Sequence, residues 1–154
     1  MKVKTVFAIT GLCYFLILTA AGQNDIEAIK GVIERETTSF FAVDRQSWEV
    51  NWANASYSYW SLCDSAGGSY VEGIENIKKN FDEYFRTAKP SKSKIDRVWL
   101  EVRLYGKGAY VRFIQKVVDD IDHDVTSEVR VMEKDKDGQW KIVCLNAVAI
   151  YPSK

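Results

Sequence analysis

Apolar residues recur at helical spacing in the region that follows the first two dozen residues, in a stripe made of Ile26, Ile29, Ile33 and Phe40. Asn24 followed by Glu27 is a capping-box pattern at the start of this stripe. The pattern predicts a helix from about Asp25 to Val43, with a single apolar face that lies across a sheet.

The next stretch is rich in tryptophan and tyrosine. Asp44 is a favourable N-cap for a short helix that places Trp48 and Trp52 one turn apart on the same side. Aromatic strand propensity then predicts a strand over 57–60. The small residues that follow predict a loop and a return strand over 68–71.

Another helical pattern begins at Gly73 and is stopped by Pro90. Its apolar stripe consists of Ile74, Ile77, Phe81 and Phe85. We therefore predict a third helix between this glycine and this proline.

From Ile95 onwards the apolar period becomes two, as in strands that have one face on a core. Four antiparallel strands are predicted, over 95–105, 110–118, 127–133 and 140–150. Asp137-Gly138 is the strongest hairpin-turn signal in the chain. Helices followed by a run of strands predict one α+β domain without repeats or linkers.

The start of the chain has the pattern of an export signal. Lys2 and Lys4 are basic, the run from Val6 to Leu18 is apolar but short for a membrane span, and residues 19–22 are small. We predict a secretory signal peptide over 1–22. An uncleaved membrane anchor is the alternative.

Cleavage after Gly22 would leave a mature domain over 23–154, periplasmic or secreted and without membrane attachment. The whole chain has 21 basic and 21 acidic residues, and the mature part has 19 and 21. Because no basic field results, nucleic acid is not an expected partner. Cys63 and Cys144 either pair in an oxidising compartment or are separate, buried thiols.

The element order and the residues at its boundaries resemble the SnoaL-like branch of the nuclear transport factor 2 and ketosteroid isomerase superfamily, over essentially the whole mature chain. The matching segments are Phe40-Phe41, Asp44 to Trp48, Tyr57 to Trp60, Glu72-Gly73-Ile74 and Asp137 to Ile142. The resemblance implies a cone-shaped fold, in which about three N-terminal helices pack on a curved, mixed, mostly antiparallel six-stranded sheet. It implies a pocket at the open end and frequently a dimer through the outer sheet face, but no single reaction.

The isomerase chemistry of this superfamily needs a carboxylate base on the first strand. Aligning the isomerase pattern along Trp52 to Ser61 places Trp60, preceded by Tyr59, at the position of the base. An indole cannot accept a proton, so this departure argues against steroid-isomerase-like proton transfer.

Alternate aspartates in the run Asp119 to Asp124 are reminiscent of a calcium loop. Val125 and Val131 stand where such a loop needs glycine and glutamate, so we interpret the run as a solvated turn. His123 is the only histidine, which argues against histidine triads and zinc sites. No metal or cofactor is expected.

Among the polar residues of the apolar strands we single out Gln115, Arg130 and Asn146, since Gln115 shares a face with Val111 and Phe113 and Arg130 lies between two valines. They either face solvent or form a structural network, or they converge in a pocket as orienting groups. With Tyr59 and Trp60 as apolar walls, the pocket interpretation predicts a site for a small apolar or aromatic molecule.

Binding of such a molecule is the leading functional hypothesis. The alternatives are a cofactor-independent isomerase or lyase of the SnoaL type, in which Arg130 stabilises an oxyanion and a carboxylate such as Glu128 moves the proton, and a protein-interaction module that uses the sheet face. A homodimer is predicted because the final hairpins carry apolar residues on both faces, with Trp99 and Tyr105 opposite to Val98 and Leu104.

Overall fold

The computed structural model describes residues 6–118 and 123–151, with side chains over 22–118 and 124–151. The elements are, in chain order, α1 (Val6–Phe41), α2 (Arg45–Glu49), β1 (Tyr59–Asp64), β2 (Gly67–Glu72), α3 (Ile74–Asn80), α4 (Asp82–Thr87), β3 (Lys94–Tyr105), β4 (Gly108–Val118), β5 (His123–Lys134) and β6 (Trp140–Ala149).

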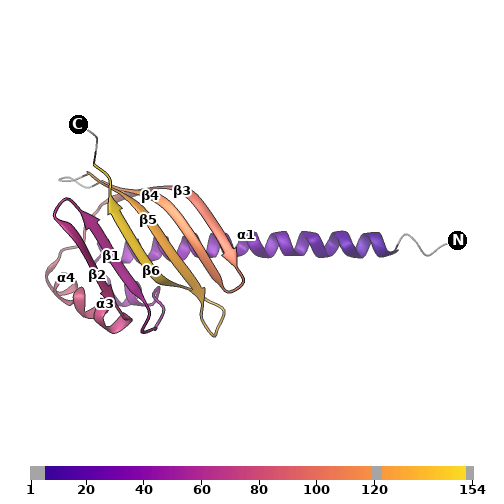
Figure 1. Ribbon diagram of the computed structural model, residues 1–154, viewed down its shortest axis with the longest axis horizontal. Coiled ribbons are helices and arrows are strands. Elements are labelled where there is room, and N and C mark those ends of the chain that lie inside the picture. Colours follow the sequence, from indigo (N-terminus) through magenta and orange to yellow (C-terminus); the bar gives the residue numbers. More distant parts are fainter. Residues whose placement is uncertain (1–5, 119–122, 152–154) are drawn as a thin grey trace.

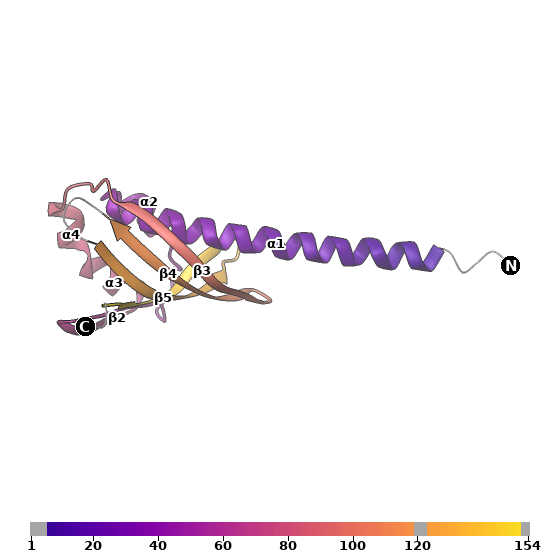
Figure 2. The ribbon, with the colours of Figure 1, turned by 90° about the horizontal axis from the view of Figure 1, so that it is seen from above.

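The strands form one six-stranded sheet in the order β2-β1-β6-β5-β4-β3. β1 pairs with β6 in parallel, and the other neighbours are antiparallel. The sheet curves around the C-terminal half of α1, while the N-terminal half of α1 extends beyond it (Figure 1). Seen from above, α3 and α4 lie at the end of the sheet remote from the N-terminus (Figure 2). The predicted α+β fold class, a mixed and mostly antiparallel sheet with helices on one face, is confirmed.

Helix α1 is longer than the predicted helix over 25–43. It begins at Val6, so Asn24 lies inside the helix and the expected capping box is not a helix start. The apolar residues that precede Asn24 continue the helix without a break, which is why no cap is needed there. Ile29 and Ile33 are fully buried against the sheet, as their stripe predicted.

The predicted leader over 1–22 lies almost wholly outside the residues whose side chains are described, and its cleavage stays a prediction. Gly22 is where α1 meets the sheet, since a Cβ placed there would be 4.0 Å from Leu104 Cδ1. Within the described part of the chain, no helix has the length and apolar character needed to span a membrane.

The short helix α2 is capped as its sequence indicates. Asp44 Oδ1 accepts a hydrogen bond from the backbone N–H of Ser47 at 3.1 Å. Trp48 and Trp52 are buried, with ring centroids 5.9 Å apart. The two rings are neighbours as predicted, but Trp52 is not part of the helix, because α2 ends at Glu49 and Trp52 forms an isolated parallel bridge with Ile142.

The prediction of a single helix between Gly73 and Pro90 is wrong, because this segment forms two short helices, α3 and α4, which meet at Phe81. Phe81 leaves helical geometry with φ −99° and ψ 5°. Its ring packs edge-on against Phe40, Trp48 and Trp60. Tertiary packing of this ring outweighs the local helical pattern.

The first hairpin also differs from its prediction. β1 begins at Tyr59 and runs through the small residues to Asp64, where a loop was expected, and the chain returns in β2 after only two residues. Small side chains do not prevent strand formation here because β1 is hydrogen-bonded on both sides, to β2 and to β6.

Strand β3 contains a bulge that changes which residues share a face. Its register with β4 shifts between Trp99 and Glu101, so Leu100 is an extra residue. Trp99, Val102 and Leu104 consequently pack on the core, whereas Val98 is exposed on the outer face. The expected strict alternation, with Val98 and Leu104 on one face, is wrong.

The two cysteines after residue 22 are unpaired. In the parallel register of β1 and β6, Cys63 lies opposite Val148 and Cys144 opposite Tyr59, four residues apart along the strands. Cys63 is exposed and Cys144 half-buried, so a disulfide between them does not form and the expectation that both thiols are buried is wrong for Cys63.

Candidate functional site

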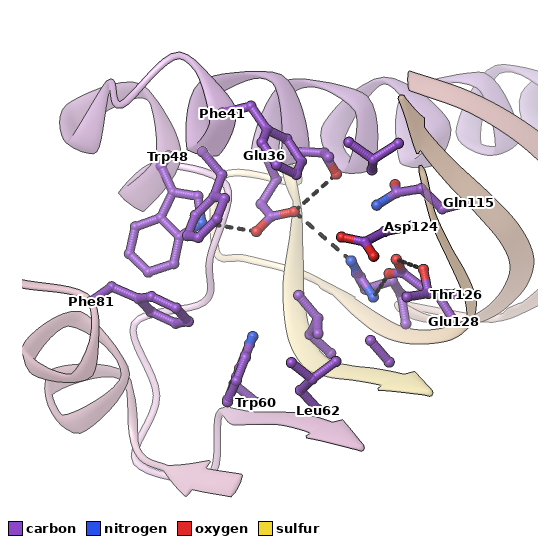
Figure 3. A pocket seen from close by; sticks show the side chains of 16 residues that line it. Glu36, Phe41, Trp48, Trp60, Leu62, Phe81, Gln115, Asp124, Thr126 and Glu128 are labelled. Atoms are coloured by element: carbon purple, nitrogen blue, oxygen red, sulfur yellow. Dashed lines mark hydrogen bonds and ion pairs between the residues drawn. The ribbon is translucent and has the colours of Figure 1, made fainter. Parts of the chain in front are cut away.

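A cavity of about 340 Å³ lies between α1 and the inner face of the sheet. Figure 3 shows the cavity from close by, with side chains entering from the helices above and from the strands below. The lining side chains are Glu36, Thr37, Phe40, Phe41, Trp48, Trp60, Leu62, Phe81, Gln115, Val117, Asp124, Thr126, Glu128, Arg130, Leu145 and Ala147.

One wall of the cavity is aromatic. The ring of Phe81 stands edge-on to Trp48 at 5.5 Å and to Trp60 at 5.1 Å. The ring of Phe40 packs edge-on to Phe81 at 5.3 Å. Together with Phe41, these rings form a preassembled apolar surface for the body of a ligand.

The opposite wall carries charged side chains that are almost fully buried. Glu36 enters from α1 and Glu128 from β5 (Figure 3). Arg130 lies two residues after Glu128 on β5 and also lines the cavity. Glu36 is 4%, Glu128 3% and Arg130 2% exposed. Charged side chains are seldom buried to this extent without close partners, so this wall is the unusual feature of the molecule.

Glu36 is held by neighbours on both sides. Its Oε1 accepts from Trp48 Nε1–H at 2.8 Å, and its Oε2 accepts from the Thr37 hydroxyl at 3.3 Å. Arg130 Nη2 is 4.0 Å from the same Oε2. Removal from water raises the pKa of Glu36 above its ordinary value, because the desolvation cost outweighs the attraction of Arg130 and the hydrogen bond from Trp48.

Glu128 is engaged more firmly than Glu36. Its Oε1 accepts a 2.7 Å hydrogen bond from the Thr126 hydroxyl, and its Oε2 lies 2.5 Å from Arg130 Nη1. The latter two atoms form an ion pair without the alignment of a hydrogen bond. Glu128 therefore serves mainly to hold the Arg130 guanidinium in place.

A second guanidinium stands behind the cavity. Arg97 of β3 and Arg130 both lie over the ring of Phe113, at 5.7 and 5.4 Å from its centroid. Burial lowers the pKa of Arg97, although Glu128 counteracts this effect. Arg97 Nε, Arg130 Nε and Gln115 Oε1 are buried without a hydrogen-bond partner among the described residues.

Three of the five residues proposed from the sequence line the cavity: Trp60, Gln115 and Arg130. The structure places Tyr59 and Asn146 elsewhere. Tyr59 stacks on Tyr70, and Asn146 Nδ2 donates to Ser61 Oγ at 2.6 Å. Successive strand residues point to opposite faces, so Tyr59 and Asn146 lie on the outer face next to inward-facing neighbours.

Sequence reasoning did not find Glu36. A signal was present, because Glu36 falls three residues after Ile33 and four before Phe40, within the apolar stripe of α1. A carboxylate at a core position of an otherwise apolar stripe indicates a buried charge. Asp124 and Thr126 were also missed, because the predicted strand began only at Ser127.

No metal centre is assembled by the described residues: they contain no group of three or more histidine, cysteine, aspartate or glutamate side chains that could hold an ion. What the wall offers instead is a pair of carboxylates and a guanidinium, which can orient a polar group or exchange a proton with it.

No protein-family model and no curated protein sequence matches this chain. Several solved structures, however, match its fold. An NTF-2 like protein of unknown function from Shewanella oneidensis has a TM-score of 0.67 at 13% identity, over 80% of this chain and 98% of that chain.

Two further neighbours carry enzyme names. A ketosteroid isomerase-like protein from Erwinia carotovora has a TM-score of 0.61 at 14% identity, over 82% of this chain and 96% of that one. A protein from Streptomyces avermitilis, proposed to be a dehydratase, has a TM-score of 0.65 at 12% identity, over 85% and 99%. Such identities establish architecture and not activity. The chain has the nuclear transport factor 2-like, ketosteroid isomerase-like fold.

Proposed function

We propose that this protein binds a small molecule that is mostly apolar and carries one polar end. The cavity between α1 and the sheet is the observation that carries the proposal. Its volume of about 340 Å³ lies at the small end of the range for ligand sites, and it joins an aromatic wall to a few convergent polar groups.

The two walls define how the ligand lies. The apolar body contacts Trp60, Phe81 and Phe40, where burial of apolar surface supplies the affinity. The polar end reaches Glu36 and Arg130, which are already fixed by Trp48 and Glu128 and therefore lose little freedom on binding.

Tryptophan fluorescence tests this proposal. The wild-type protein is titrated with a panel of apolar amines, alcohols and carboxylates, and the same titration is run on Trp60→Phe. We expect a saturable change in emission that is strongly reduced in the variant. Trp99→Phe, which alters a tryptophan outside the cavity lining, is the matched control and should keep the response. An absence of response to every compound would contradict the proposal.

A second candidate is acid–base catalysis by a cofactor-independent isomerase or lyase, and the enzyme names of two structural neighbours support it. The specific observation in its favour is the buried Glu36, whose pKa is raised by desolvation, as in many carboxyl groups that act as general acids or bases. Arg130 is placed to stabilise an oxyanion. Glu128, the proton carrier suggested by sequence, suits that role less well because it is paired with Arg130.

Deuterium exchange distinguishes catalysis from binding. Ketones that bind are incubated with the protein in D₂O, and proton magnetic resonance follows exchange at the carbon next to the carbonyl. An enzyme would accelerate exchange, and Glu36→Gln would abolish the acceleration while binding persists. Exchange at the uncatalysed rate would leave binding alone as the function.

We also propose that the domain acts outside the cytoplasm after removal of residues 1–22. Gly22 lies where α1 reaches Leu104 of the sheet, which supports this proposal. A cut after Gly22 would leave the part of α1 that packs on the sheet intact. Sequencing of the exported protein's N-terminus tests the proposal, and retention of Met1 would contradict it.

A further inference from the structure

The buried polar atoms of the cavity lining that lack a hydrogen-bond partner among the described residues are of both kinds, the acceptor Gln115 Oε1 and the donor Arg130 Nε. The Thr126 hydroxyl and Trp48 Nε1–H already donate to carboxylates. The Thr37 hydroxyl lies 3.0 Å from Ile33 O and 3.3 Å from Glu36 Oε2, and its one hydrogen is shared between these acceptors. Glu128 Oε2 and Arg130 Nη1 also lack an aligned hydrogen bond, but these two atoms pair with each other at 2.5 Å. Because neither donors nor acceptors predominate among the free atoms, the nature of the ligand's polar end depends on the charges of the lining and on the surroundings of Glu36.

The charged side chains of the lining favour a cationic ligand. Three carboxylates, Glu36, Asp124 and Glu128, face the cavity together with one guanidinium, Arg130. Figure 3 shows the Asp124 carboxylate pointing into the cavity. Arg97 offsets part of this charge from behind the wall, but it is not among the lining residues and offers no contact to a ligand.

Of the three carboxylates, Glu36 has the most unused hydrogen-bonding capacity. Its Oε2 receives one long hydrogen bond of 3.3 Å and has the Arg130 nitrogen only at 4.0 Å. A cation close to this oxygen would compensate the desolvation that now raises the pKa of Glu36. The neighbouring rings of Trp48 and Phe41 present the kind of surface to which ammonium groups are attracted.

We propose that the polar end of the ligand is a protonated amine, bound between Glu36 and the aromatic wall. This inference rests on the proposed function and specifies its ligand class. An anionic ligand is disfavoured by the same geometry, because Arg130, the one cationic side chain among the lining residues, is already paired with Glu128.

Three probes with one common body test the class directly: 4-phenylbutylamine, 4-phenylbutanol and 4-phenylbutyrate. Calorimetric titration of the full chain at neutral pH should show the amine binding about tenfold more tightly than the alcohol, since a charged hydrogen bond contributes at least this much. The carboxylate should bind most weakly.

Two variants assign the preference to the cavity. Glu36→Gln keeps the acceptor for Trp48 Nε1–H but removes the charge, so the amine should lose about tenfold in affinity and approach the alcohol. Asp124→Asn should weaken the amine to a smaller extent. Glu34→Gln changes an exposed carboxylate two residues away on the same helix and should leave all three affinities unaltered.

The outcomes separate this inference from the function on which it rests. Equal or tighter binding of the alcohol or the carboxylate would overturn the amine class and leave a binding cavity. An amine preference that survives in Glu36→Gln and Asp124→Asn would also overturn it. No binding of any probe would contradict both the amine class and the proposed function.

Discussion

Trp48 and Trp60 both contact Phe81, but only Trp48 is fully buried. Trp48→Ala should therefore cost about 3–5 kcal/mol of unfolding free energy, as for other core aromatic residues. Trp60→Ala should cost clearly less, because part of its indole already faces an open cavity. Urea denaturation of both variants measures the difference. Equal losses would mean that Trp60 belongs to the core and that the cavity is closed.

Glu36 should make stability depend on pH. Its pKa is raised in the folded protein, so folding favours the protonated form. The stability that this preference supplies is complete below the unfolded pKa, near 4.5, and is lost as pH rises through the higher folded pKa. Each unit by which the pKa is raised corresponds to about 1.4 kcal/mol.

The difference in unfolding free energy between Glu36→Gln and the wild type isolates this dependence from the other carboxylates. The variant should gain relative to the wild type between pH 4.5 and 8. Chemical denaturation across this range measures it, with Glu34→Gln as the control that should run parallel to the wild type. A constant difference would show that folding does not raise the pKa of Glu36.

The burial of Glu36 also shows what sequence can and cannot predict about the site. Trp60 was found because it stands at the position of the isomerase base, and Gln115 and Arg130 were found because they are polar residues within apolar strands. Tyr59 was wrongly included, although successive strand residues point to opposite faces. Glu36 was missed because a glutamate in a helix usually faces solvent, and only the partners on α2 and β5, Trp48 and Arg130, explain its burial.

At the scale of elements, the carboxylate of Asp25 joins α1 to the sheet by polar contacts, in addition to the apolar stripe of the helix. Asp25 accepts from Trp140 Nε1–H at 2.9 Å and forms an ion pair with Lys134 at 2.7 Å. Asp25→Ala should cost about 1–3 kcal/mol because it removes hydrogen bonds that involve a charged group. Glu27→Ala, an exposed change on the same helix, should stay within about 0.5 kcal/mol.

Thermal unfolding of the two variants side by side provides the measurement. The hydrogen bonds to Asp25 lower its pKa, so its contribution should be present above pH 3.8 and fade as pH falls through the lower folded value. Equal stability of Asp25→Ala and Glu27→Ala would show that α1 is held by its apolar stripe alone.

Most elements were predictable from local pattern, and their failures have tertiary causes. The apolar stripes and the period-two strands gave the order of helices and strands. The break at Phe81, the bulge after Trp99 and the extension of β1 to Asp64 each depend on contacts with segments far away in the chain. Such contacts leave no periodic trace in the sequence.

At the scale of the whole molecule, the outer sheet face carries a row of residues that pair across four strands, Val98, Ile114, Ser127 and Val148. Val98 is 61% and Val148 42% exposed. We propose that this face forms a homodimer, since exposed apolar surface on a sheet favours association.

Sedimentation velocity at micromolar concentration should give a dimer mass for the wild type and a monomer mass for Val98→Lys/Val148→Lys, because two buried lysines would oppose the interface. Val50→Lys, at an equally exposed valine outside the sheet, should remain dimeric. A wild-type monomer at this concentration would contradict the proposed dimer.

The indole N–H resonances of the five tryptophans offer the most direct test of the central claim, that the cavity between α1 and the sheet binds a small molecule. In ¹⁵N-labelled protein titrated with 4-phenylbutylamine, the resonances of Trp60 and Trp48, which line the cavity, should shift with a common saturation curve. Trp140, which donates to Asp25 outside the lining, should not move. Shifts confined to Trp140, or no shift at Trp48 and Trp60 at saturating ligand, would contradict the claim.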